Sequence, residues 1–135
     1  MPYLRYIATE VRQRLRAQEL PIVPLILFPK GANGSLKNIA QTSGYDVIGL
    51  DWCIEPSVAR DIVGPSVALQ GNLDPNVLYG GKEAIERQVK RTCESFRGGG
   101  ETKAWIANLG HGITPGVDPE DLRFFFECVH RYSAN

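Results

Sequence analysis

The sequence has no excess of either charge. Its 135 residues include 15 Lys and Arg and 15 Asp and Glu, so the formal net charge is zero. This balance gives no electrostatic basis for binding a nucleic acid or a membrane surface. No apolar run approaches the roughly 20 residues that a membrane span needs. The N-terminal stretch carries charges every few residues, so we expect neither a signal peptide nor a membrane segment.

Cysteine is also scarce. Cys53, Cys93 and Cys128 are odd in number and far apart in the sequence. A disulfide framework or a CxxC metal site would need paired or closely spaced cysteines. We therefore expect free thiols, buried or half-buried, in a reducing cytosol.

What the sequence does contain is an alternation of helical and strand patterns. An apolar content of 43% and a charged content of 22% fit one small folded domain, or a piece of a larger one. Leu4, Ile7, Ala8, Val11 and Leu15 recur at helical spacing, whereas the run VPLILF is short and continuously apolar, as in a strand covered on both faces. The predicted strands are 23–28, 46–52, 66–72 and 104–110; the predicted helices are an N-terminal one ending before Pro21, then 35–44, 55–64, 82–96 and 118–132, with a glycine-rich loop at 97–100.

Several residues mark the ends and buried sides of these helices. Ser35 is a capping-type residue at the start of the second helix, and glycines close the second and third. Asp118 is the expected N-cap of the last helix, with Pro119 as its first residue. The positions expected to face inward are Ile85, Val89 and Phe96 in the fourth helix and Leu122, Phe125, Phe126 and Val129 in the last.

Alternating strands and helices predict an α/β protein with parallel strands joined by right-handed crossovers. Four strands could form a small doubly wound sheet or half of a (β/α)8 barrel. A dinucleotide-binding unit would carry GxGxxG after its first strand, but PKGANG has the wrong spacing. Every strand instead ends in polar or glycine-rich residues, which a barrel would gather on one rim, where its active site lies.

Three stretches resemble one enzyme family. VIGLDW, VALQGNLDPNVLYG and WIANLGHGITPGVDPEDL are similar, in order and spacing, to the C-terminal half of uroporphyrinogen decarboxylases. FRGGGETKAWIANLGHGITPG looks most like the fungal members. The resemblance extends over essentially all of the chain, so we expect residues 1–135 to be a partial domain of this family.

The resemblance implies a (β/α)8 TIM barrel, of which this chain would be the C-terminal half with four parallel strands. It also implies a cytoplasmic homodimer that uses no metal or organic cofactor. The family removes the carboxyl groups of the four acetate side chains of uroporphyrinogen, which gives coproporphyrinogen in haem biosynthesis. Family members are more than twice as long as this chain, so we expect a fragment or a truncated product.

His111 is the residue on which function centres. It lies between two glycines, after the last predicted strand and before a helix N-terminus that favours anions. The resemblance implies that His111 contacts a substrate carboxylate. The family's essential aspartate, its arginine motif, and a tyrosine and a serine of the cleft belong to the part upstream, so we predict no catalytic residue in this chain and no activity of the chain alone.

Other polar residues at the strand ends are weaker candidates. Asp51 ends the second strand, and Gln70 and Asn72 flank a glycine at the end of the third, where they could orient the cleft. Lys30 could pair with a carboxylate or be an ordinary exposed lysine. Asp74, followed by proline, is typical of a turn and helix start. Cys128, His130 and Arg131 in the last helix are expected to cap that helix or to pack.

Two alternatives stay open. Corrinoid methyltransferases of the same superfamily hold zinc through His-x-Cys and a later cysteine, but neither His111 nor His130 is followed by that pattern, so no metal site is predicted. The second alternative is a non-catalytic chain that associates with a full-length subunit. In either case half a barrel would expose its two sheet edges, VPLILF and AWIANL, and an apolar inner face, which predicts aggregation or pairing with another half.

Overall fold

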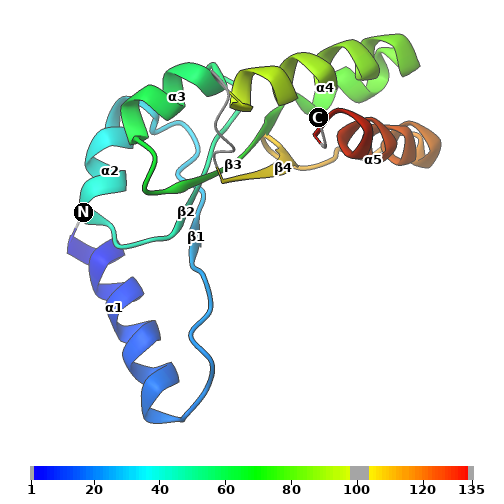
Figure 1. Ribbon diagram of the computed structural model, residues 1–135. Helices are drawn as coiled ribbons and strands as arrows, with labels where there is room; N and C mark the ends of the chain where they lie inside the picture. The colour runs from blue at the N-terminus through cyan, green and yellow to red at the C-terminus, as the bar shows by residue number, and fades with distance from the viewer. Residues whose placement is uncertain (1, 98–103, 134–135) are drawn as a thin grey trace.

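A computed structural model describes residues 2–97 and 104–133. Four parallel strands form one sheet in chain order, β1-β2-β3-β4 (Figure 1). The predicted parallel sheet and the predicted order of strands and helices are therefore confirmed. The strands are β1 (Ile26–Leu27), β2 (Val47–Gly49), β3 (Ala68–Leu73) and β4 (Trp105–Leu109).

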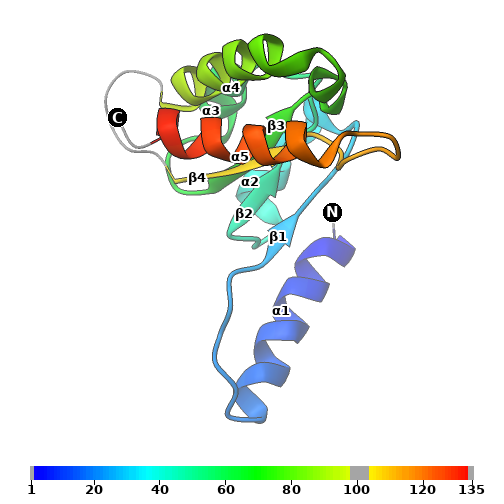
Figure 2. The same cartoon turned by 90° about the vertical axis from the view of Figure 1, so that its right-hand side faces the viewer.

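Five helices accompany the four strands. Helices α2 to α5 lie on one side of the sheet, and the opposite side is open (Figures 1 and 2). Such one-sided cover of a parallel sheet is what half of a (β/α)8 barrel has, because the strands of a barrel carry their helices on the outside. The helices are α1 (Pro2–Ala17), α2 (Leu36–Thr42), α3 (Pro56–Val63), α4 (Gly81–Arg97) and α5 (Pro119–Ser133), with short 3-10 turns η1 (Asn33–Ser35) and η2 (Pro75–Tyr79).

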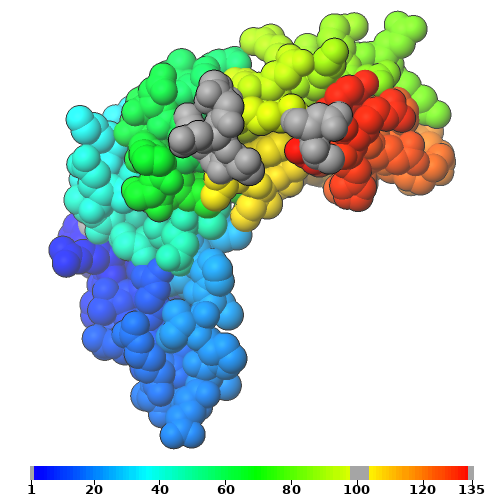
Figure 3. Space-filling model, viewed as in Figure 1, coloured from blue at the N-terminus to red at the C-terminus, as the bar shows by residue number. Residues whose placement is uncertain are grey.

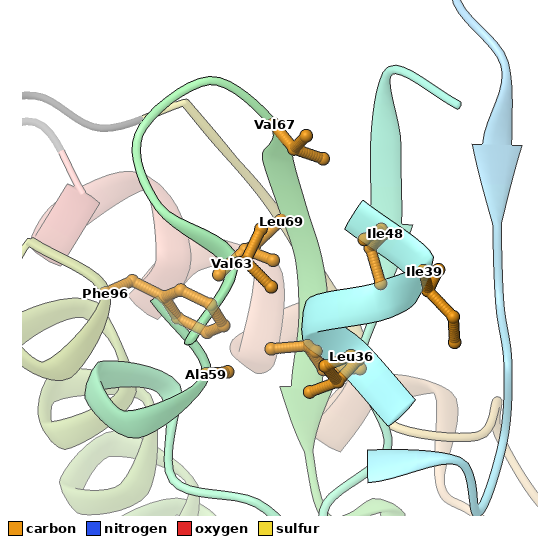
Figure 4. Close-up of a cluster of buried hydrophobic side chains, with 9 residues drawn as sticks. Leu36, Ile39, Ile48, Ala59, Val63, Val67, Leu69 and Phe96 are labelled. Atoms are coloured by element: carbon orange, nitrogen blue, oxygen red, sulfur yellow. The ribbon is translucent and has the colours of Figure 1, made fainter. Parts of the chain in front are cut away.

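The hydrophobic core fills the space between the sheet and its helices. One cluster joins β2 and β3 to α2, α3 and the end of α4 (Figure 4). A second cluster joins α4 to α5 and to the carboxyl ends of β3 and β4. Every inward position predicted for α4 is buried. The first cluster contains Leu36, Ile39, Ile48, Leu50, Ala59, Val63, Val67, Leu69 and Phe96; the second contains Leu73, Leu78, Ile85, Val89, Cys93, Leu109, Phe125 and Cys128.

The N-terminal region differs most from expectation. The predicted strand 23–28 is reduced to Ile26–Leu27, and Ile26 and Phe28 are exposed rather than covered on both faces. The strand is short because β1 has a neighbour on one side only, and Ile26 and Phe28 are exposed because they lie on the open face of the sheet. Helix α1 buries Ala8 but leaves Ile7 exposed. Together with residues 18–25 it extends away from the sheet as an arm, which gives the molecule the bent outline of Figure 3.

Arg12 is the main polar anchor of this arm. Its guanidinium donates to the carbonyl oxygen of Gly44 at 2.6 Å and to Asp46 Oδ2 at 2.7 Å. The same Asp46 oxygen accepts the backbone N–H of Leu25 at 2.7 Å. One carboxylate therefore ties both α1 and the segment before β1 to the start of β2.

One predicted helix boundary signal and one predicted inward position differ from the structure. Asp118 caps α5 as expected, because its carboxylate accepts the backbone N–H of Glu120 at 2.9 Å. Ser35 makes no side-chain cap, since the 3-10 turn before α2 places it in a different backbone geometry. Phe126 is 52% exposed and not buried, because the buried stripe of α5 passes through Phe125 and Cys128. Residues 98–100 of the predicted loop lie outside the described residues.

Arg60 is a buried cation that the sequence patterns did not indicate. Its guanidinium donates to the carbonyl oxygens of Gly64 (2.9 Å), Val67 (2.7 Å) and Ala104 (3.0 Å). Burial lowers the pKa of Arg60 from its ordinary value. The residue thereby fastens the end of α3 to the amino ends of β3 and β4, the side of a barrel that serves stability.

The three cysteines are free thiols, as expected. Cys93 and Cys128 are buried as expected, and burial raises the pKa of both thiols. The expectation is wrong for Cys53, which lies in the loop after β2 and is exposed. Within residues 2–97 and 104–133, no helix is both long enough and apolar enough to cross a bilayer.

Candidate functional site

The loops that follow β1, β2 and β4 meet at the carboxyl end of the sheet. The backbone N–H of Gly31 donates to Asp51 Oδ2 at 2.7 Å, which joins the first loop to the second. Gly110 lies so close to the second loop that an added Cβ would be 2.6 Å from the backbone nitrogen of Trp52. Only glycine fits there, so the GHG segment sets how closely His111 approaches the end of β2.

Asp51 is the hub of these loops. The residue is 4% exposed, and its carboxylate also accepts hydrogen bonds from Asn33 Nδ2 at 2.9 Å and from the backbone N–H of Cys53 at 3.0 Å. Burial opposes ionisation, but these hydrogen bonds and the charge of Lys30 together outweigh it and lower the pKa of Asp51. An ionised carboxylate with three donors from the protein is suited to fixing loops rather than to proton transfer.

Asn72 has a related role beside it. Its side-chain amide donates to the carbonyl oxygens of Asp51 at 2.8 Å and Ile54 at 2.7 Å, and the residue is buried. It holds the loop after β2 from the β3 side. Like Asp51, Asn72 therefore supports the rim of the site.

His111 and Gln70 line a hollow of about 120 Å³ on the open side of the sheet. Of the four predicted site residues, the structure thus brings these two together on the hollow and places Asp51 and Asn72 beneath the loops. Asn108 of β4 also lines the hollow, although it was not among the site residues predicted from the sequence. Its position two residues before the GHG segment could have indicated it. The other lining residues are Phe28, Gly49, Leu50 and Leu109.

The exposed imidazole of His111 packs against Trp52. Their ring centroids are 5.9 Å apart at an interplanar angle of 71°, an edge-to-face contact. The ammonium of Lys30 lies 5.6 Å from the centroid of the same indole. Trp52 is the last residue of the LDW motif, and its position in the sequence alone does not indicate this contact. Trp52 links the two basic side chains of the rim.

A tyrosine holds the far part of the loop that carries His111. The hydroxyl of Tyr79 is 2.7 Å from Thr114 Oγ1 and donates to the carbonyl oxygen of Pro115 at 3.1 Å. Tyr79 belongs to η2, which begins where Asp74 accepts the backbone N–H of Asn76 at 2.9 Å. Asp74 is therefore the turn and helix-start residue that its position before proline predicts.

The remaining candidates lie on α5, away from this end of the sheet. Cys128 is buried in the core between α4 and α5. Arg131 pairs with Glu86 at 3.0 Å, and His130 is exposed. In the part of the chain that the structure describes, no three His, Cys, Asp or Glu side chains are grouped so as to hold a metal ion.

The comparison with protein families decides the family. The model described as "Uroporphyrinogen decarboxylase (URO-D)" matches residues 1–132. The chain belongs to the uroporphyrinogen decarboxylase family. It is 49% identical to the uroporphyrinogen decarboxylase of Schizosaccharomyces pombe over 134 residues, which are 98% of this chain and 36% of that protein. The human protein is 44% identical over 133 residues, 98% of this chain and 35% of its own length.

The chain spans about a third of the length of the curated relatives it matches. Among solved structures, a methyltransferase from Methanosarcina mazei matches with a TM-score of 0.70 and 16% identity, covering 96% of this chain and 34% of that one. At this identity the likeness shows the fold alone. It is the likeness expected for part of a TIM barrel.

Proposed function

We propose that this chain is the C-terminal part of a uroporphyrinogen decarboxylase domain, and that the hollow beside His111 binds a carboxylate-bearing side chain of uroporphyrinogen. The observation that carries the proposal is the position of His111. It lies on a glycine-flanked loop at the carboxyl end of a parallel sheet, next to the amide side chains of Gln70 and Asn108. Imidazole and amide N–H groups are donors suited to a carboxylate.

In this proposal the chain binds and orients the substrate, and the chemistry needs residues from the rest of the domain. Decarboxylation without a cofactor uses the pyrrole ring as the electron sink and passes through a protonated, positively charged pyrrole. A fixed carboxylate stabilises such a cation. Asp51 is not suited to that task, because its carboxylate is buried under the loops and accepts three hydrogen bonds. We therefore expect the isolated chain to have no decarboxylase activity.

The proposal extends to the setting of the whole protein. By family likeness it is a cytoplasmic homodimer that converts uroporphyrinogen to coproporphyrinogen in haem biosynthesis without metal or cofactor. The open side of the sheet supports association with the remainder of a barrel, since Ile26, Phe28 and Ile106 are exposed there. The same exposed side chains favour, as a second candidate, a non-catalytic chain that binds a full-length subunit.

A chimeric enzyme tests the first proposal. The matching C-terminal part of the Schizosaccharomyces pombe enzyme is replaced by this chain, and conversion of uroporphyrinogen to coproporphyrinogen is measured. We expect activity in the chimera and none in the chain alone. His111→Ala should lower kcat/KM about 30-fold, because a charge-assisted contact to the substrate is lost. The matched control is His130→Ala, on the outer surface of α5.

Three results would contradict the proposal: a folded, soluble chimera without activity, turnover by the chain alone, or equal effects of the two histidine variants. The second candidate has its own test. Affinity capture of an intact family enzyme by the tagged chain, with no change in that enzyme's activity, would favour a non-catalytic role.

A further inference from the structure

Lys30 stands out as a cation beside Trp52, the aromatic neighbour of His111. Within the described part of the chain it forms no salt bridge with an acidic side chain. The nearby carboxylate of Asp51 is occupied by donors from Gly31, Asn33 and Cys53. The ammonium group instead lies over the indole of Trp52, 5.6 Å from its centroid. A contact of this kind orients an ammonium group but leaves its N–H donors available to an anion.

The backbones beneath Lys30, Trp52 and His111 are fastened to one another. Gly31, which follows Lys30, is hydrogen-bonded to Asp51, which precedes Trp52. Gly110, which precedes His111, is in direct backbone contact with Trp52. Three loops from three different strands therefore present a lysine, an indole and an imidazole as one preorganised unit.

We propose that Lys30 is a second substrate-contacting residue, whose ammonium binds a carboxylate of the substrate held at His111, and that Trp52 is the positioning residue that keeps both side chains in place. This inference rests on the proposed function and adds to it a specificity for substrates with several carboxylates. The residues lining the hollow include no acidic side chain, and the carboxylate near Lys30, that of Asp51, already accepts hydrogen bonds from Gly31, Asn33 and Cys53. Holding the lysine on the indole reduces the conformational entropy that it loses on binding.

Binding can be followed by nuclear magnetic resonance through the indole N–H signals of the two tryptophans, Trp52 and Trp105. The indole of Trp105 donates to the carbonyl oxygen of Gly71 at 2.8 Å and stacks on Phe96, so its signal reports an intact sheet. The indole of Trp52 reports the site. Titration with uroporphyrin, which has eight carboxylates, should shift the Trp52 signal and leave that of Trp105 in place. Coproporphyrin, with four, should bind several-fold more weakly.

Substitutions then distinguish a specific contact of Lys30 with the ligand from a non-specific effect of losing one positive charge. Lys30→Met should weaken uroporphyrin binding about tenfold, the loss expected for one charge-assisted contact, and Lys30→Arg should restore most of it. The matched control is Lys82→Met, because Lys82 lies over Phe124 at 5.5 Å in the same kind of contact but on α4. Equal weakening by Lys30→Met and Lys82→Met, or no weakening by Lys30→Met, would overturn the inference.

Kinetics of the chimeric enzyme give a second, independent readout. We expect Lys30→Met to raise KM about tenfold and to change kcat less than twofold, since a remote carboxylate contact contributes to binding. Trp52→Phe should stay near the parent, whereas Trp52→Leu should raise KM as Lys30→Met does. An active chimera with an unchanged KM in Lys30→Met would refute the role of Lys30 and leave the proposed function intact. An inactive chimera would instead count against the proposed function.

Discussion

The two faces of the sheet are built from neighbouring residues and yet have opposite environments. On the helix-covered face, Ile48, Leu69 and Phe96 are almost completely buried. On the open face, Ile106 is 43% exposed, although the residue before it, Trp105, stacks on Phe96 with ring centroids 4.7 Å apart. The chain thus completes one hydrophobic core and leaves the other unfinished. Stability should depend on the first face, and association and substrate binding on the second.

The largest expected effect on stability is seen when two phenylalanines that contact opposite faces of the sheet are compared. Phe96→Ala should lower the free energy of unfolding by about 3 to 5 kcal/mol, because it opens a cavity in the core between the sheet and α4. Phe28→Ala should cost less than about 1 kcal/mol, since Phe28 is 44% exposed. Urea unfolding followed by circular dichroism measures both. Equal losses would show that the two faces do not differ as described.

The helix-covered face is also the part of the molecule that the sequence predicted best. Ile85, Val89 and Phe96 recur at helical spacing, and that spacing alone determines which side of α4 meets the sheet. Asp118 was predictable as a cap because its partner is two residues away. The open face was not predictable in the same way. A strand pattern shows that Ile26 and Ile106 are apolar, but not whether another strand covers them.

Only the residues of the candidate site that belong to a recognisable sequence motif could be predicted. His111 could be selected from its glycine-flanked loop and the family resemblance. The partners of Asp51 could not, because Gly31 and Asn33 lie 20 and 18 residues before it and one of them donates through its backbone. Arg60 was missed for a similar reason, since its acceptors are backbone carbonyls, one of them 44 residues away. A side chain that contacts a distant backbone group cannot be recognised from the sequence, because any residue type can supply that backbone group.

Arg60 gives the next largest effect. Arg60→Met keeps much of the side-chain volume but leaves the carbonyl oxygens of Gly64, Val67 and Ala104 without this donor. We expect a loss of about 3 kcal/mol in the free energy of unfolding. Arg87→Met, at an exposed position of α4, is the control and should change it by less than about 0.5 kcal/mol. A loss as small as that of the control would contradict the stabilising role of Arg60.

Asp51 should have a smaller effect that depends on pH. Asp51→Asn replaces one of the two acceptor oxygens by an NH2 group, so either Gly31 or the pair Asn33 and Cys53 loses its acceptor, at a cost of about 2 kcal/mol near neutral pH. Because the folded-state pKa is lowered, the carboxylate's contribution is present above the ordinary Asp pKa and is lost as the pH falls below about 4. Unfolding at several pH values should therefore show the two proteins converging in acid. A difference that is constant with pH would contradict this account.

The smallest effect on stability, and the one that separates the two faces most clearly, is expected on the open face. Ile26→Thr with Ile106→Thr replaces two exposed apolar side chains, 48% and 43% accessible, by a residue that also favours strands. Since neither isoleucine is covered, we expect the free energy of unfolding to change by less than about 1 kcal/mol. Self-association should nevertheless fall, because the apolar surface that another sheet would cover becomes smaller.

Concentration-dependent size-exclusion chromatography and binding of a hydrophobic dye measure this change. Val58→Thr is the matched control, because Val58 is equally exposed but lies on α3, on the helical side of the sheet. It should alter neither elution nor dye uptake. If the double variant behaves like the control, the open face is not what drives association. If the double variant alone becomes monomeric while unfolding as before, the open face has no part in the stability of the chain, which is the behaviour expected of a surface that another part of a barrel covers.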